Sequence, residues 1–385
     1  MNYADIEYNL VLAGWLIALL LGIILLIFKT PDNEQHVYYE KGKNICAAAL
    51  LIFGSELLFQ WLIRFYLELS DPVLSVSVYL FSFCAATLLI TAGFCAMLAP
   101  EKMNRTQRAL AAATLGVYSI ILLFNKLMIS NRSTQVTLII VSCALLFIIN
   151  CIAIYKCIYI YRWAINRMRT YYSDFMENLM RWMPGVGVGI MIFLISAPIT
   201  CLCPKIVGIY QLALGIIMFI YTFVSIINFS FRYSTVATAL VNNEIHNSDD
   251  DMQQQPDDDT NGPATTANGG STLSDTLCQI MQEKEQRWQQ RGGYRTPGIT
   301  IEQAARDIGT NRNYLSRYLN EVKNVTFYEW VAQMRINEAL SLMQADPNAT
   351  IEHIAGQVGF SSSSAFSATF KKVVGITPNQ WRNRQ

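Results

Sequence analysis

Two short stretches near the carboxyl terminus repeat one pattern: Ile301-Glu-Gln-Ala-Ala-Arg-Asp-Ile-Gly309 and Ile351-Glu-His-Ile-Ala-Gly-Gln-Val-Gly359. In each stretch the apolar residues recur at i, i+3, i+4 and i+7, the spacing that places them on one face of an α-helix. A glycine follows at once, and glycine readily adopts the positive φ of a tight turn between two crossed helices. The sequence therefore predicts two helix-turn-helix units in tandem within Ile299–Arg382.

A second helix is predicted after each of these glycines. Its inward-facing residues are expected to be Leu315, Tyr318, Leu319 and Val322 in the first unit, and Phe366, Thr369, Phe370 and Val373 in the second. Between the units, Thr326 and Glu329 have the spacing of a capping box at a helix start. The helix that they begin runs to about Met343, so a strut roughly 27 Å long should separate the two units.

Further residues of this region match a known pattern. They are Arg335-Ile-Asn-Glu-Ala339, Ile354-Ala-Gly-Gln-Val-Gly-Phe360, Phe366, Phe370-Lys371-Lys372, and Gly375-Ile-Thr-Pro378 with Arg382. With these residues the region resembles the AraC/XylS class of bacterial transcription regulators. The resemblance implies double-stranded DNA as a partner, with the two recognition helices in successive major-groove segments, and RNA polymerase as a further partner of an activator. It does not extend to the chain before this region.

The exposed face of the first recognition helix supplies candidate DNA contacts. We predict base contacts from Asn313, Ser316 and Arg317. Arginine can bind guanine O6 and N7, and asparagine can bind adenine N6 and N7, in the major groove. The resemblance also implies base contacts at these three positions; for each one the alternative is a phosphate contact or plain solvation. Phosphate contacts are predicted from Arg312, Asn320, Lys323, Lys371, Lys372 and Arg382.

The second recognition helix offers weaker chemistry for base recognition. Its candidate base contacts are Ser363, Ser364 and Ser367. Ala368 stands where the family commonly has an arginine, which argues against strong base readout by this helix. We therefore expect the second unit mainly to position the domain on the phosphate backbone, and the first unit to supply most of the sequence specificity.

The rest of the chain is unusually apolar. Hydrophobic residues make up 52% of the 385 residues and charged residues only 15%, which does not suit two ordinary soluble domains. Seven stretches reach membrane-spanning length: Tyr8–Phe28, Ile45–Leu67, Val73–Leu98, Ala109–Leu127, Gln135–Ile160, Gly185–Cys203 and Ile206–Phe231. The predicted fold is all-α, a seven-helix transmembrane bundle followed by a soluble tandem helix-turn-helix DNA-binding domain.

The loop charges predict the orientation of these spans, because short loops rich in lysine and arginine stay in the cytoplasm. With the amino terminus outside, the inner loops hold ten lysines and arginines, and the outer loops hold three, Lys126, Arg132 and Lys205. Seven spans then place the DNA-binding domain in the cytoplasm. We predict a multi-pass protein of the bacterial cytoplasmic (inner) membrane with its amino terminus outside.

These features divide the chain into four parts. They are a membrane domain, a disordered acidic linker, a connecting helix and a DNA-binding domain, at residues 1–241, 242–270, 271–291 and 292–385. The linker is predicted from its low hydrophobicity and clustered aspartates. The connecting helix has an apolar stripe, which fits a helix that packs on the DNA-binding domain, or one that mediates dimerisation or coupling to the membrane.

The second span carries three polar residues on one helical face, Glu56, Gln60 and Arg64. Ionisable residues within a span are costly and usually face a bundle interior or a cavity. One interpretation is a packing pair between Glu56 and Arg64 that Gln60 bridges. The other is a polar ligand pocket that opens to the outside.

The longest inner loop lies between the fifth and sixth spans. Its apolar residues fall on one helical face between arginines: Ile165, Met168, Tyr172, Phe175, Met176 and Leu179. This pattern fits an interfacial helix or a cytoplasmic extension of the fifth span. A lever that contacts the DNA-binding domain is the alternative.

Together these features predict a membrane-embedded transcription regulator controlled by a signal sensed through its membrane domain. The alternative is a transporter or channel-like protein with an appended DNA-binding domain, which the few intramembrane charges disfavour. The three histidines are far apart in sequence, without a phosphate loop, nucleophile elbow or metal motif. We therefore predict no enzyme activity, no catalytic residue, no metal site and no cofactor. The remaining predicted partners are the lipid bilayer, a small-molecule or envelope signal and, as an open alternative, a second copy in a homodimer.

Overall fold

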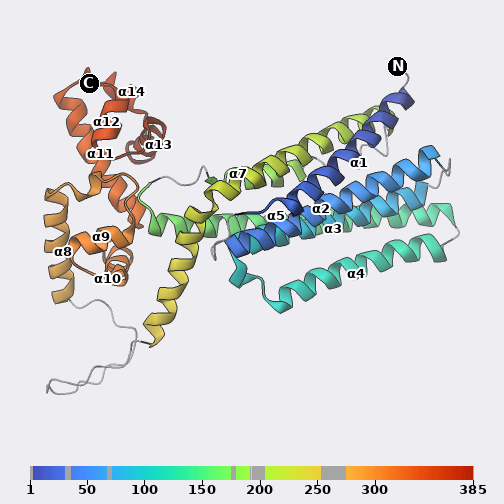
Figure 1. Ribbon diagram of the computed structural model, residues 1–385, viewed down its shortest axis with the longest axis horizontal. Coiled ribbons are helices and arrows are strands. Elements are labelled where there is room, and N and C mark those ends of the chain that lie inside the picture. Colours follow the sequence, from blue (N-terminus) through green and yellow to red (C-terminus); the bar gives the residue numbers. More distant parts are fainter. Residues whose placement is uncertain are drawn as a thin grey trace. The chain divides into compact units, whose positions relative to one another are not determined.

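The computed structural model describes residues 3–30, 36–66, 72–129, 131–174, 179–190, 192, 204–252 and 275–384. Within these ranges the chain is almost wholly helical (Figure 1). One isolated antiparallel β-bridge joins Tyr172 to Thr300. The all-α prediction is confirmed. The chain forms two compact units: Met1–Ala164 with Leu179–Thr238, and Ile165–Asn178 with Ala239–Gln385.

Long apolar helices build the first unit, and two of them continue into the second. They are α1 (Tyr3–Ile27), α2 (Val37–Trp61), α3 (Pro72–Leu98), α4 (Arg105–Met128), α5 (Arg132–Tyr171) and α7 (Pro204–Met252). A π-helical turn, η2 (Leu62–Tyr66), extends α2, and a 3₁₀ turn, η3 (Pro100–Lys102), follows α3. In the described part of the chain, six helices are long and apolar enough to cross a membrane.

Small residues let these helices pack closely. A Cβ atom added at Gly42 of α2 would lie 2.6 Å from the carbonyl oxygen of Gly93 in α3, so these two backbones are almost in contact. A Cβ atom at Gly54 would lie 2.8 Å from the Leu19 side chain of α1. Close approach at small residues is a common way for helices to associate in lipid.

The outward faces of this unit are apolar as well. On α4, Leu110, Ile120, Leu123 and Leu127 are each more than half exposed. A helix on the surface of a soluble domain usually places polar side chains on its outer face. The outer face of α4 therefore suits contact with lipid chains rather than with water.

The helix boundaries differ from the predicted ones at two places. The fifth span was expected to end at Ile160, whereas α5 continues without a break to Tyr171. The linker was expected from Asn242, whereas α7 continues to Met252. Extending an existing helix requires no new nucleation, which helps polar residues to continue it. Of the predicted sixth span, residues 185–190 are helical, and most of the remainder lies outside the described residues, as does the predicted linker after Met252.

The polar residues of the second span lie near the end of α2. Glu56 is only 4% exposed, and Gln60 donates a hydrogen bond from Nε2 to the Ser75 carbonyl oxygen of α3 at 2.8 Å. Arg64 belongs to η2, and its side chain lies outside the described part of the structure. Glu56 and Gln60 thus face the packed interior between helices, as ionisable groups in spans commonly do.

The second unit contains the tandem helix-turn-helix region. Its elements are α8 (Asp275–Gln290), η5 (Gly293–Arg295), α9 (Ile301–Ile308), α10 (Arg312–Arg317), η6 (Tyr318–Val322), α11 (Phe327–Ala345), α12 (Ile351–Gln357), α13 (Ser363–Val374) and α14 (Pro378–Arg382). Helices α9 and α10 with η6 form the first unit of the tandem, and α12 and α13 form the second. The predicted capping box of Thr326 and Glu329 begins α11, the strut that links them.

Most of the predicted inward-facing residues are buried. These are Ile301, Ala304, Ala305, Ile308, Leu315, Tyr318, Leu319, Ile354, Ala355, Val358, Phe366, Thr369 and Phe370. The prediction is wrong at Val322 and Val373, which are 47% and 38% exposed. Val322 ends the π-helical turn η6, whose wider winding rotates it out of line with Tyr318. After Phe370 it is Val374, rather than Val373, that packs against the core.

The two predicted turn glycines have positive φ angles, 76° at Gly309 and 92° at Gly359. Their surroundings differ. A Cβ atom at Gly309 would have no atom within 4 Å, whereas one at Gly359 would lie 2.2 Å from the Arg295 carbonyl oxygen. Gly359 is therefore required both for its backbone angle and for the close approach of the chain around η5.

This difference gives a stability prediction. Gly309→Ala should cost only the left-handed strain of about 1–2 kcal/mol, and Gly359→Ala should cost clearly more because it adds a clash with backbone. Urea unfolding of a fragment covering residues 275–385 would measure both free energies of unfolding. Equal losses in the two variants would contradict the proposed role of the Arg295 contact.

Candidate nucleic-acid interface

The first recognition helix begins at a well-formed cap. The Asn311 side chain accepts a hydrogen bond from the Tyr314 N–H at 2.8 Å, which satisfies an N–H that the helix leaves unpaired. Leu315 is buried beneath this helix, while Arg312, Asn313, Ser316 and Arg317 are partly exposed. The predicted base-contact residues therefore share an accessible face of α10.

Arg317 lies in a weak surface pair. Its Nε is 3.2 Å from Glu321 Oε1, and the two side chains are 40% and 44% exposed. Exposed pairs of this kind contribute little to stability. The Arg317 guanidinium can therefore leave Glu321 and bind another group at little cost in free energy. Asn320, the neighbouring candidate, is exposed, and its Nδ2 lies 3.5 Å from Ser316 Oγ.

The connecting helix α8 packs on this first unit through a buried carboxylate. Glu285 is 4% exposed and accepts hydrogen bonds from Tyr318 Oη at 2.7 Å and Trp330 Nε1 at 2.9 Å. Lys323 Nζ lies 3.0 Å from the same carboxylate. Burial and Glu285 together raise the pKa of the Tyr318 hydroxyl. The structure thus shows that α8 packs on the helix-turn-helix region, one of the alternatives predicted for it. Lys323, a predicted phosphate contact, forms an ion pair with α8.

The predicted contacts of the second unit are exposed near the start and end of α13. Ser363, Ser364 and Lys371 are exposed, and Ser367 is partly so. Lys372 Nζ lies 3.8 Å from Glu329 and 5.3 Å from the centre of the Tyr328 ring. Burial lowers the pKa of Lys372 from its ordinary value.

Arg382, a predicted phosphate contact, makes a hydrogen bond within the second helix-turn-helix unit. Its Nη2 donates to the Ala349 carbonyl oxygen at 2.7 Å, and the side chain is partly buried. This bond ties α14 to the loop between α11 and α12. Arg382 therefore holds the second unit together, and any contact with a phosphate would come in addition to that.

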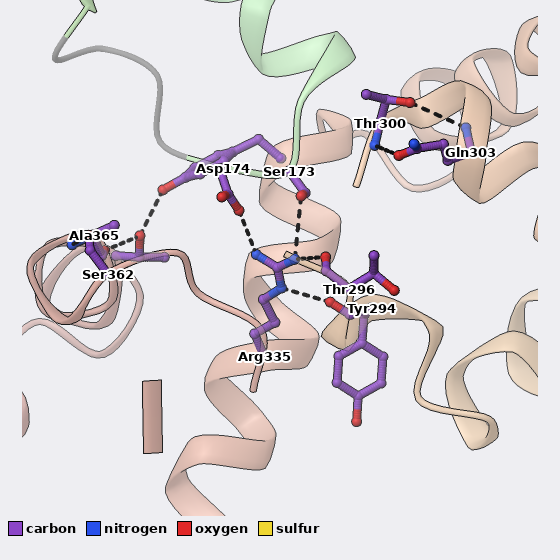
Figure 2. A network of polar contacts seen from close by, with 11 residues as sticks. Ser173, Asp174, Tyr294, Thr296, Thr300, Gln303, Arg335, Ser362 and Ala365 are labelled. Atoms are coloured by element: carbon purple, nitrogen blue, oxygen red, sulfur yellow. Dashed lines mark hydrogen bonds and ion pairs between the residues drawn. The ribbon is translucent and has the colours of Figure 1, made fainter. Parts of the chain in front are cut away.

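Arg335 has a buried side chain that connects distant segments, a role that the sequence did not reveal. Its side chain is 0% exposed, although sequence analysis placed it only within the family pattern. Nε donates to the Tyr294 carbonyl oxygen and Nη2 to that of Thr296, each at 2.8 Å, while Nη1 lies 2.9 Å from Asp174 (Figure 2). The signal that could have revealed this is the helical spacing of Arg335 with the buried Ala332 and Ala339.

The comparisons with known proteins concern the same part of the chain. Residues 304–384 match the family described as a helix-turn-helix domain. The "Probable transcription factor PqrA" of Proteus vulgaris is 32% identical over 96 residues, which are 25% of this chain and 78% of that protein. This chain belongs to the AraC family of transcription regulators. The matched residues 304–384 lie within the second compact unit and include α10 and α13, the two predicted recognition helices.

Larger AraC-type relatives match over the same domain alone. The melibiose operon regulatory protein of Escherichia coli K12 is 37% identical over 84 residues, 22% of this chain and 28% of that protein. The Msm operon regulatory protein of Streptococcus mutans is 28% identical over 109 residues, 28% of this chain and 37% of that protein. The chain thus spans only about a third of these relatives' lengths or less. No solved structure matches the chain.

The base-contact prediction for the first unit can be tested with Arg317. Arg317→Ala should lose about 1–3 kcal/mol of binding to a selected DNA site, because a bidentate arginine–guanine contact is worth that much. Binding to a scrambled duplex should change far less. Titration of both duplexes at one salt concentration would measure this, with Arg306→Ala on α9 as a control of equal charge. An equal loss on both duplexes would instead mark Arg317 as a phosphate contact.

A second test should distinguish the roles of Lys371 and Arg382, because their substitutions are expected to change different quantities. Lys371→Ala should lower the slope of log affinity against log salt by roughly 1, as the loss of one phosphate contact does, and should leave thermal stability unchanged. Arg382→Ala should lower the melting temperature, because it removes the bond to the Ala349 carbonyl. A salt slope unchanged in Lys371→Ala would remove that residue from the DNA interface.

Proposed function

We propose that this AraC-family protein is a transcription regulator embedded in the bacterial cytoplasmic membrane. Residues 1–241 would form the membrane domain, and residues 292–385 would bind promoter DNA in the cytoplasm. The observation that carries the proposal is that six described helices long and apolar enough to span a membrane share one chain with an AraC-type domain. Exposed apolar faces, such as that of α4, support insertion.

The orientation rests on loop charge and on the number of spans. The inner loops carry ten lysines and arginines and the outer loops three when the amino terminus lies outside. An odd number of spans then brings the DNA-binding domain to the cytoplasm. The predicted sixth span, Gly185–Cys203, brings the count from six to seven, and most of it lies outside the described residues.

On DNA, we propose a division of labour between the two units. Asn313, Ser316 and Arg317 on α10 would read bases, while Lys371 and the serines of α13 would contact the backbone and hold the register. The exposure of both sets supports this assignment. Since α10 carries the only arginine and asparagine among the predicted base contacts, it would supply most of the discrimination between base pairs.

The membrane domain would act as the sensor. Glu56 and Gln60 are polar groups enclosed between helices, and such groups commonly mark a ligand or ion site. We propose that a small molecule or an envelope signal alters the packing of these helices. A signal can shift DNA binding only through different affinities for two arrangements of the protein. Residues 165–174, at the end of α5, offer a connection between the membrane domain and the DNA-binding domain.

The topology gives the first test. Tags fused after Met1 and after Gln385 should respond oppositely in intact spheroplasts: protease should remove the amino-terminal tag and spare the carboxyl-terminal one. Both tags should become accessible once the cells are lysed, and the protein should pellet with the membranes. Protection of both tags in spheroplasts would indicate an even number of spans and overturn the outside amino terminus.

A further inference from the structure

The end of α5 packs against the helix-turn-helix region of the same compact unit. Met168 and Tyr171 are 2% and 3% exposed, and Tyr172 is 8% exposed. Tyr172 forms the antiparallel bridge with Thr300, just before α9, and the Ser173 N–H donates to the Ile299 carbonyl oxygen at 3.1 Å. Residues 165–174, here termed the α5 tail, thus bind to the segment that leads into the first unit.

Two residues of the α5 tail complete the surroundings of a buried charge. Asp174 Oδ1 lies 2.9 Å from Arg335 Nη1, and Ser173 Oγ lies 3.4 Å from Arg335 Nη2 (Figure 2). The other contacts of this guanidinium are the carbonyl oxygens of Tyr294 and Thr296. A fully buried arginine requires a counter-charge, and Asp174 supplies it from a position 161 residues earlier in the chain.

The α5 tail also reaches the residues predicted to contact DNA phosphates. Tyr171 Oη lies 3.2 Å from Glu302 Oε2 of α9, and Arg312 lies over the Tyr171 ring, 5.6 Å from its centre. Burial lowers the pKa of Arg312, and the positive charge of Arg167 acts in the same direction. Near the second unit, the charge of Arg169 lowers the pKa of Lys372 in addition to burial.

We propose that the α5 tail binds, as an internal ligand, to a docking site on the DNA-binding domain. Bound there, it competes with the DNA backbone for Arg312. The site consists of Arg335 at its base, the Ile299–Thr300 backbone at its edge and Glu302 with Arg312 at its rim. The proposal rests on the proposed function, since it assigns the regulation of the DNA-binding surface. In the docked state Arg312 lies against the Tyr171 ring. A DNA phosphate that binds Arg312 must therefore displace Tyr171 from it.

The continuity of α5 connects this site to the membrane domain. The helix runs without a break from Arg132 to Tyr171, and its apolar part is one of the candidate spans. A rotation or shift of that span would therefore reach Tyr171 along the helix, and Ser173 and Asp174 follow within three residues of its end. The docked and released states of the α5 tail are the two arrangements whose balance a signal would change.

Docking can be tested by a disulfide in the full-length protein. Tyr172→Cys combined with Thr300→Cys should form one readily on oxidation, because residues paired across a β-bridge have the spacing that a disulfide needs. A protease site introduced within residues 253–274 would release the carboxyl-terminal fragment on cleavage, unless the disulfide retains it. Each single-cysteine variant is the control, and Thr300→Cys alone also measures the loss of the α9 cap. Release of the fragment from the oxidised double variant would overturn docking.

Competition with DNA is tested on the same protein in lipid nanodiscs. The oxidised double variant should bind a selected DNA site at least about 5-fold more weakly than after reduction, which is the lower end of usual coupling between two sites. Asp174→Ala, which removes the counter-charge from the α5 tail, should bind more tightly than wild type. Asp307→Ala removes the same charge from an exposed position of α9 and serves as the control.

The outcomes separate this proposal from the proposed function. If the disulfide forms but DNA affinity is the same before and after reduction, competition is overturned while docking stands. If Asp174→Ala and Asp307→Ala change affinity equally, the effect is one of net charge, and the role of the counter-charge is overturned. If wild type and reduced double variant bind no DNA selectively, the proposed function fails together with competition, and the disulfide alone decides docking.

Discussion

The DNA-binding unit depends on a charge that it buries completely. Arg335 lies on α11, the helix between the two helix-turn-helix units, and its guanidinium contacts the chain around η5 as well as Asp174. Burying an arginine is unfavourable unless its donors are satisfied. In the docked arrangement, the carbonyl groups of Tyr294 and Thr296 and the carboxylate of Asp174 satisfy these donors. Arg335 thereby joins the strut, the entry to α9 and the end of α5 in one network.

A second buried charged group, Glu285, has a similar effect in the first helix-turn-helix unit. Glu285 of α8 accepts hydrogen bonds from Tyr318 and Trp330, and the Trp288 ring stacks on Trp330 at a centroid distance of 5.1 Å. The recognition helix is thus supported by an element that precedes the family domain in sequence. An AraC-type domain in this protein is a helix-turn-helix pair together with the flanking segments that complete its core.

The two compact units follow different physical rules. In the first compact unit, glycines such as Gly42 and Gly93 allow backbones to pack closely, and large apolar side chains face outward. In the second compact unit, helices bury their apolar faces and expose polar ones, as is usual for a domain in water. The helix α5 belongs to both units, because its apolar part lies in the first and its last residues lie in the second.

The sequence by itself determined the all-α fold, the tandem repeat and the apolar helices, because each follows from a local period of apolar residues and from caps such as Thr326 with Glu329. It also identified Arg317 and Lys371 as candidate DNA contacts, since an exposed helical face can be deduced from the buried one. Only the tertiary structure decided the positions of Arg335, Lys323 and Arg382, whose partners Asp174, Glu285 and the Ala349 carbonyl lie far from them in sequence. It likewise showed that the α5 tail contacts the segment before α9 and the Arg335 side chain. An amphipathic period shows that a helix has an apolar face, but the surface that covers this face is set by shape and charge complementarity between distant segments.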